Sequence, residues 1–112
     1  MVERVFYGDL LRFIQDCVSK RRIFWTYHVN MRLKKRAISR EEILEAVGNY
    51  EIIENYPDER YFPSCLVFAK NGEKVFHVVF ALDYGDQNVR VVTAYRPDSE
   101  RWEPDLKTRR KS

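Results

Sequence analysis

The chain has 112 residues, and its 20 Lys and Arg outnumber its 17 Asp and Glu by a formal charge of only +3. This length suits a single domain over residues 1–112, and a 45% hydrophobic composition with 16 aromatic residues excludes a disordered chain. No apolar run reaches the roughly 18 residues of a membrane span, and no signal-peptide layout is present. Cys17 and Cys65 lack metal-type spacing, so we expect a cytoplasmic protein with reduced thiols, without metal, cofactor or membrane contact.

The first predicted element is an amphipathic helix over residues 3–20. Its apolar residues recur at three- and four-residue spacing: Phe6, Leu10, Phe13, Ile14, Cys17 and Val18. Residues 22–26 contain an Ile-Phe-Trp run, which favours either a short strand or a tight connection.

A second helix is expected from Tyr27 to about Arg36. Ser39 and Glu42 then have capping-box spacing, in which the Ser39 hydroxyl accepts a backbone hydrogen bond and Glu42 reaches back to the backbone of Ser39. A third helix follows this box and stops near residues 48–49.

The second half of the chain changes to short apolar and β-branched runs. Strands are expected over residues 51–56, 65–69, 74–82 and 89–95. Asn71-Gly72 predicts a hairpin, because both residues accept positive φ. Helices followed by antiparallel strands are typical of the α+β class, so we predict N-terminal helices packed on a small antiparallel sheet of about four strands.

The near-neutral total charge conceals unlike blocks. Residues 17–40 contain eight bases and no acid, whereas residues 41–88 contain three bases and ten acids. Residues 107–112 add four bases. Such asymmetry indicates an anionic partner, although charge runs are usually only solvated faces.

One face of the second helix is a candidate phosphate-contacting surface. At about 100° per residue, His28, Arg32, Lys35 and Arg36 share one arc. Three cations and an imidazole repel one another unless an anion is near. The alternative is a solvated face with a half-buried His28.

Two residues of the predicted sheet are also candidates for a role in catalysis or binding. His77 lies within an apolar strand and is either a core residue or a proton-transfer group. Tyr95 either orients a phosphate or packs over the sheet. Because nucleophile, glycine-loop and metal motifs are missing, any catalysis would be metal-free acid–base chemistry. RNA cleavage fits, since the 2′-hydroxyl supplies the nucleophile.

Several motifs resemble those of one family. Thr26-Tyr27-His28, Arg32 and Arg36-Ala37-Ile38-Ser39 resemble the T-x-H-x-x-x-R-x-x-x-R-G-I-S signature of a bacterial domain family of unknown function, number 4258. The resemblance continues in order through residues 56–57, 63–64, 77–79, 92–98 and 102–109, covering about residues 23–110 and leaving residues 1–22 outside. Ala37 stands where the family usually has Gly, so a positive φ there would mean strain or a different turn.

That family is similar to the RelE/BrnT-like toxin superfamily, which packs helices on a small antiparallel sheet. Its members are typically endoribonucleases, free or ribosome-dependent, that an antitoxin protein neutralises. The resemblance therefore implies a RelE-like fold, RNA at the ribosome or free as substrate, an antitoxin partner, and functional positions at His28, Arg32, Arg36, His77 and Tyr95.

Two functions remain open at this point. The first is an RNA-binding domain acting as a metal-independent endoribonuclease toxin, with His28 or His77 transferring the proton and Tyr95 orienting the phosphate. Its expected RNA contacts are Arg32, Lys35, Arg36, Arg96, Lys107 and Arg109. The second is a non-catalytic nucleic-acid or protein-binding module with His77 in the core. A third possibility is that the acidic block, residues 41–88, meets a basic surface of another subunit.

Overall fold

The computed structural model describes residues 7–111, which form an α+β fold with a five-stranded sheet. The helices are α1 (Gly8–Ser19), α2 (Tyr27–Lys35), α3 (Arg40–Glu45) and the 3₁₀ turn η1 (Ala46–Asn49). The strands are β1 (Ile23–Trp25), β2 (Glu51–Tyr56), β3 (Ser64–Asn71), β4 (Lys74–Asp83) and β5 (Asn88–Tyr95). The predicted helix residues 3–6 lie outside the described residues. Within residues 7–111, no helix is long and apolar enough to span a membrane.

The sheet is mixed and has the strand order β1-β5-β4-β3-β2. Strands β2 to β5 form the predicted antiparallel meander, and β1 adds a parallel edge strand, pairing Ile23 with Val89 and Trp25 with Val91. The prediction of about four antiparallel strands was therefore one strand short. A three-residue segment is too short to show a period, and its partner lies more than sixty residues away along the chain.

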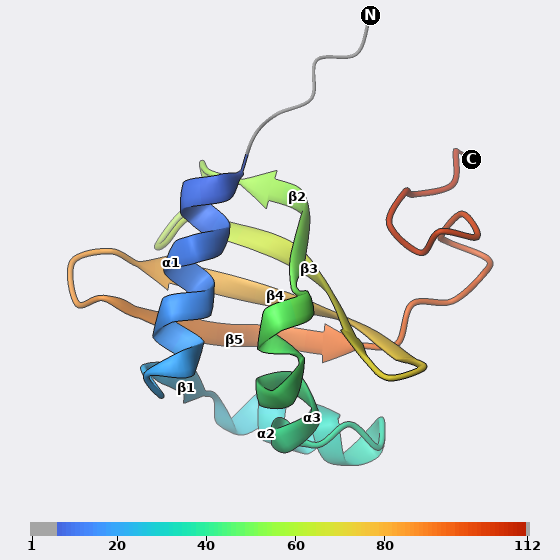
Figure 1. The fold of residues 1–112 in the computed structure, drawn as a ribbon, viewed down its shortest axis with the longest axis horizontal. Helices are drawn as coiled ribbons and strands as arrows, with labels where there is room; N and C mark the ends of the chain where they lie inside the picture. The colour runs from blue at the N-terminus through green and yellow to red at the C-terminus, as the bar shows by residue number, and fades with distance from the viewer. Residues whose placement is uncertain (1–6, 112) are drawn as a thin grey trace, which may run out of the picture.

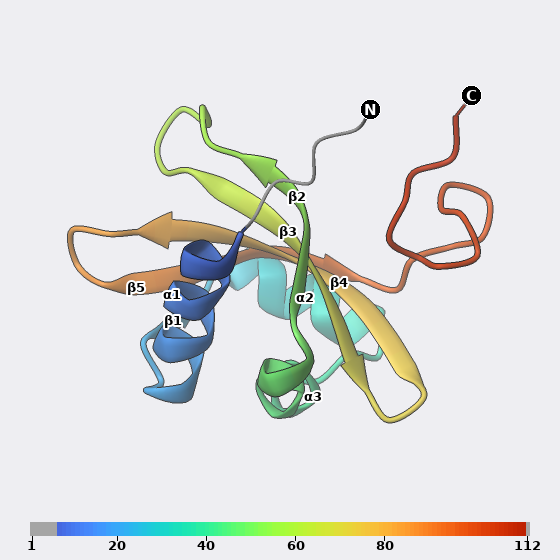
Figure 2. The same ribbon diagram turned by 45° about the horizontal axis from the view of Figure 1, so that its top comes forward.

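Helices α1 and α3 cover one face of this sheet (Figures 1 and 2). On β4, Phe76, Val78, Phe80 and Leu82 point into the core that the helices share with the sheet. The alternation of side chains along a strand sends the intervening His77 to the opposite face. There the segment after β5, residues 96–111, folds back toward the sheet (Figure 1).

Local signals place the helix starts and the hairpin as expected. The hydroxyl of Thr26 accepts from the backbone N–H of Val29 at 3.1 Å, and the hydroxyl of Ser39 accepts from that of Glu42 at 3.0 Å. The predicted cap at Ser39 is confirmed, but the Glu42 carboxylate instead accepts from Lys74 of β4 at 3.1 Å. Gly72 has φ +62°, as the predicted hairpin requires.

The end of α2 depends on the conformation of Ala37. This residue has φ +54°, in the left-handed region that favours glycine. The N–H of Ile38 donates to the Leu33 carbonyl at 3.0 Å and that of Ala37 to the Lys34 carbonyl at 3.3 Å, the two bonds of a Schellman motif. Ile38 and Leu33 are both buried beneath it. The turn is therefore the one a glycine would form, and Ala37 adopts it with strain.

Candidate nucleic-acid interface

An open groove runs along the exposed side of α2. Its volume is about 540 Å³, and it is lined by His28, Met31, Arg32, Lys34 and Lys35, all of them exposed. Among the residues that the structure describes, no acid lines it. We call this the α2 groove. Three of the four residues on the predicted arc, His28, Arg32 and Lys35, meet here.

The fourth residue of that arc, Arg36, turns away toward β5. Its Nη1 donates to the Ala94 carbonyl at 2.7 Å and to the Thr93 hydroxyl at 3.3 Å. Arg96 makes the converse contact, donating from Nη2 to the Ala37 carbonyl at 3.0 Å. The predicted basic arc is thus divided between two neighbouring sites.

The second site is a pocket of about 430 Å³ between the end of α2, the end of β5 and the C-terminal segment. It is lined by Arg36, Tyr95, Arg96, Asp98, Arg101, Trp102 and Arg109. We call it the arginine pocket. Four guanidinium groups face a single carboxylate, that of Asp98, and the Asp98–Arg101 pair is long at 4.0 Å. Since Arg32 and Arg36 are one helical turn apart, the pocket continues the cationic side of the α2 groove.

Two of the four basic C-terminal residues, Lys107 and Arg109, are paired with the acidic block. Lys107 Nζ lies 2.7 Å from the Glu51 carboxylate, and Arg109 makes a two-pronged contact with Glu54 at 2.6 and 3.1 Å. Burial alone would raise the pKa of Glu54, but the hydrogen bonds from Arg109 and Tyr56 outweigh it and lower that pKa. Lys107 and Arg109 therefore anchor the C-terminal segment on β2, whatever else they contact.

His77 is fully buried and both of its ring nitrogens are engaged within the chain. Nε2 lies 2.6 Å from the Leu106 carbonyl, which can only accept, so Nε2 carries the hydrogen. Nδ1 is then the acceptor for the Tyr95 hydroxyl at 3.3 Å. Burial lowers the pKa of His77 and favours this neutral form, although the Leu106 carbonyl and the Glu54 carboxylate oppose that shift.

An aromatic cluster on the second face of the sheet holds His77 in place. The Trp102 ring meets the His77 ring edge-on, with 4.4 Å between centroids and an interplanar angle of 88°. Trp102 is itself only 2% exposed and lies under the Arg109 guanidinium, 4.7 Å from the ring centroid. Leu106, whose carbonyl His77 contacts, has φ +60°, a costly conformation for a bulky side chain.

The nine sequence-predicted residues therefore occupy four places. His28, Arg32 and Lys35 line the α2 groove, and Arg36, Arg96, Arg109 and the Tyr95 ring line the arginine pocket. His77 lies beneath the pocket, linked to it through the Tyr95 hydroxyl, and Lys107 lies over Phe68 beside β2. The structure does not bring His77 and His28 to one surface.

Sequence reasoning missed several residues of these sites. Lys34 and Met31 line the α2 groove, and Lys34 belongs to the same basic block that indicated the groove. Arg101 and Asp98 line the arginine pocket, but they lie in an irregular segment whose path no periodicity reveals. Within residues 7–111, no three His, Cys, Asp or Glu side chains gather as metal ligands would.

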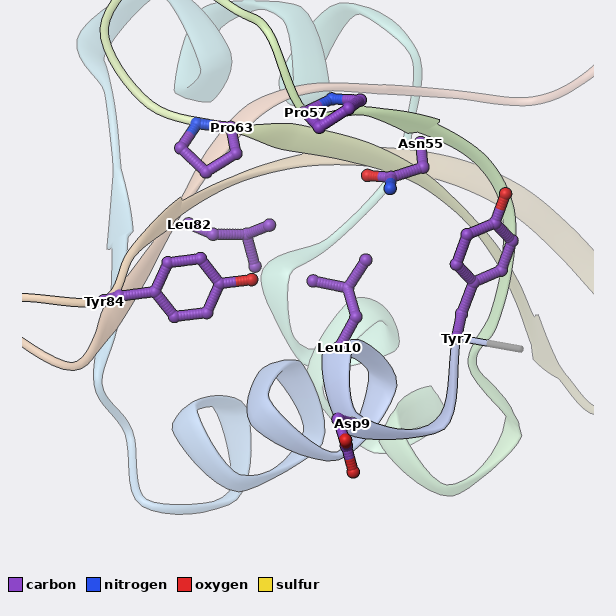
Figure 3. A pocket seen from close by; sticks show the side chains of 8 residues that line it. All are labelled: Tyr7, Asp9, Leu10, Asn55, Pro57, Pro63, Leu82 and Tyr84. Atoms are coloured by element: carbon purple, nitrogen blue, oxygen red, sulfur yellow. The ribbon is translucent and has the colours of Figure 1, made fainter. Parts of the chain in front are cut away.

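A third, largely apolar cavity of about 600 Å³ lies at the start of α1 (Figure 3). Leu10, Leu82, Pro57 and Pro63 form much of its wall, and the Tyr84 hydroxyl points toward Leu10. None of the sequence-predicted site residues lines this cavity.

Together these observations define a small α+β domain with a basic helical groove and an adjoining arginine-lined pocket. Residues 25–96 match the family described as a domain of unknown function, DUF4258. The match spans more than half of the chain, which therefore belongs to this family; it includes α2, α3 and strands β2 to β5, and leaves out α1, the first two residues of β1 and the segment after Arg96. Neither a curated protein nor a solved structure matches the chain.

Proposed function

We propose that this protein binds RNA through the α2 groove. The observation that carries the proposal is the absence of any acid among the groove residues, where His28, Arg32, Lys34 and Lys35 are all exposed. Like charges at helical spacing destabilise a helix, and a polyanion lying in the groove relieves that repulsion.

The groove also offers more than charge. Met31, which is 55% exposed, and the aliphatic stems of the neighbouring bases give an apolar floor between the cations. A floor of this kind accommodates ribose and base surfaces while the cations contact phosphates, as in sequence-tolerant binding of single strands.

Binding without cleavage is the form of the proposal that the geometry supports best. Both nitrogens of His77 and the hydroxyl of Tyr95 are already engaged in hydrogen bonds under Trp102. Proton transfer at a scissile phosphate requires a group within hydrogen-bond reach of the reacting atoms. A buried imidazole with no unused nitrogen does not meet that requirement.

The test is a binding titration with a single-stranded RNA labelled at an internal base, followed by fluorescence anisotropy. Arg32→Gln and Lys35→Gln should each weaken binding and reduce the slope of log affinity against log salt by about 1. Arg12→Gln is the matched control, since Arg12 is exposed on α1 and lines neither basic site. Equal losses in all three variants would contradict a localised groove.

A second candidate function is metal-independent RNA cleavage by a RelE/BrnT-like toxin. The favouring observation is that His28 is exposed in the α2 groove beside Arg32, which places an accessible imidazole next to a phosphate-binding cation. An antitoxin partner would then cover this same groove.

Cleavage is tested by incubating RNA with the protein in EDTA, with and without ribosomes. Fragments that disappear in His28→Ala but persist in His77→Ala would support His28 as the proton-transfer group. Growth arrest on expression that His28→Ala abolishes would support a toxin. Intact RNA under all conditions, with binding retained, leaves RNA binding as the function.

A further inference from the structure

Two cations of the arginine pocket have no acidic partner within residues 7–111. Arg36 and Arg96 donate only to neutral oxygens, those of Thr93, Ala94 and Ala37. Neither forms an ion pair within residues 7–111. Two uncompensated guanidinium groups at one pocket repel each other, and an anion held between them removes that repulsion.

These two arginines are also held ready for a ligand. Each guanidinium has five N–H donors, and the carbonyl contacts use only Nη1 of Arg36 and Nη2 of Arg96. The remaining donors stay available in a planar fork that matches the oxygens of a phosphate. Because the carbonyl contacts already fix both side chains, binding requires little further ordering.

The remaining two arginines contribute less to an incoming anion. Arg109 is occupied by Glu54 and lies over Trp102, and Arg101 has a highly exposed side chain near Asp98. The pocket therefore offers two uncompensated positive charges. A phosphodiester carries one negative charge, whereas a terminal phosphate monoester carries close to two at neutral pH, because its second pKa is about 6.

The aromatic residues of the pocket are unsuited to reading a base. One face of the Trp102 ring is covered by Arg109, and its surface is 2% exposed. The Tyr95 ring packs against His77, with 5.3 Å between centroids. Stacking of a base requires a free aromatic face. Trp102 therefore offers no free face to a base, and we expect the pocket to recognise the phosphate group through its arginines.

We infer that the arginine pocket binds a phosphate monoester at an end of RNA, independently of the terminal base. The inference rests on the proposed function, because the phosphate belongs to an RNA whose following nucleotides lie in the adjoining α2 groove. Arg36 and Arg96 contact the terminal phosphate, which enters beside the end of β5.

The experiment compares three RNAs of one sequence, labelled internally, that end in a 5′-phosphate, in a 3′-phosphate or in hydroxyl groups at both ends. One phosphorylated form should bind about tenfold more tightly than the hydroxyl form, the gain expected from added hydrogen bonds to a charged group. Arg96→Gln should abolish the preference, Arg96→Lys should keep only part of it, and Arg12→Gln should keep it in full. Urea unfolding of each variant confirms that it is folded.

The outcomes separate this inference from the proposed function. Equal binding of all three RNAs by the wild-type protein overturns the terminal-phosphate site while RNA binding stands. If no RNA binds but adenosine 5′-monophosphate does, and Arg96→Gln abolishes that binding, the proposed function fails and the phosphate monoester site stands. If the protein binds neither RNA nor the nucleotide, both the proposed function and the phosphate monoester site are overturned.

Discussion

Arg36 and Arg96 tie the end of α2 to the end of β5 by reciprocal hydrogen bonds. Arg36 donates to the carbonyl two residues before Arg96, and Arg96 donates to the carbonyl directly after Arg36. The second of these carbonyls belongs to Ala37, whose left-handed conformation turns it out of the helix. One strained residue thus helps to position the two arginines to which we assign the terminal phosphate.

Ala37→Gly should stabilise the fold. Removing the left-handed strain should raise the free energy of unfolding by about 1–2 kcal/mol. The greater freedom of glycine in the unfolded chain should lower it by roughly 0.4–1 kcal/mol. We expect a net rise of about 0.5–1 kcal/mol in the free energy of unfolding, measured by urea titration. Lys34→Gly, one turn inside α2, is the matched control and should lower stability instead. A loss of stability in Ala37→Gly would show that the turn does not need glycine.

His77 should make stability depend on pH. Burial lowers its pKa in the folded protein, so between that value and the unfolded value of about 6.5 the unfolded chain binds the additional proton. The free energy of unfolding should therefore fall as the pH drops below about 6.5, and level off below the folded pKa. Urea unfolding from pH 8 to pH 5 measures this slope.

The matched variants for that slope are His77→Asn and His28→Asn. His77→Asn should flatten the decline below pH 6.5, even if it lowers stability throughout. His28→Asn should leave the decline intact, because His28 is exposed. An unchanged slope in His77→Asn would assign the pH dependence to other groups.

Trp102→Ala should destabilise the fold by about 3–5 kcal/mol, as expected when a buried tryptophan is removed. The same change should uncover His77, whose ring meets Trp102 edge-on, and make it reactive toward diethyl pyrocarbonate. Trp25→Ala, at a half-buried position of the edge strand β1, should cost clearly less and leave His77 protected. Protection of His77 in folded Trp102→Ala would mean that another group covers it.

The two ion pairs between β2 and the C-terminal segment should differ in strength. A double-mutant cycle on Glu54 and Arg109 should give a coupling of about 1 kcal/mol, because the contact is two-pronged and Glu54 is largely shielded. The same cycle on Glu51 and Lys107, both well exposed, should give less than about 0.5 kcal/mol. High salt should reduce the second coupling further. Equal couplings would contradict the role of shielding.

Local patterns in the sequence predicted most of the secondary structure. Spacing of apolar residues located α1, the Ser39 hydroxyl marked the start of α3, and Asn71-Gly72 marked the hairpin whose Gly72 has positive φ. At Ala37, where the family usually has Gly, the sequence left open a strained residue or a different turn, and the structure shows the strained residue with positive φ. All of these depend on neighbours within a few residues, which is why a sequence alone can reveal them.

Pairing between distant segments was decided only by the tertiary structure. The parallel contact of β1 with β5 has no local signature, and it made the sheet one strand larger than predicted. From the sequence, Lys107 and Arg109 were predicted to be cations available for RNA. The tertiary structure instead places them beside Glu51 and Glu54 of β2, with which they form ion pairs.

The sequence by itself thus determined the α+β class, the family and the basic character of α2. Folding decided which charges remain uncompensated, because an ion pair depends on distance in space and the partners here lie more than fifty residues apart. Folding pairs Lys107 and Arg109 with acids and buries His77 beside Trp102. It also brings Arg36 and Arg96 together, with no acidic partner for either within residues 7–111.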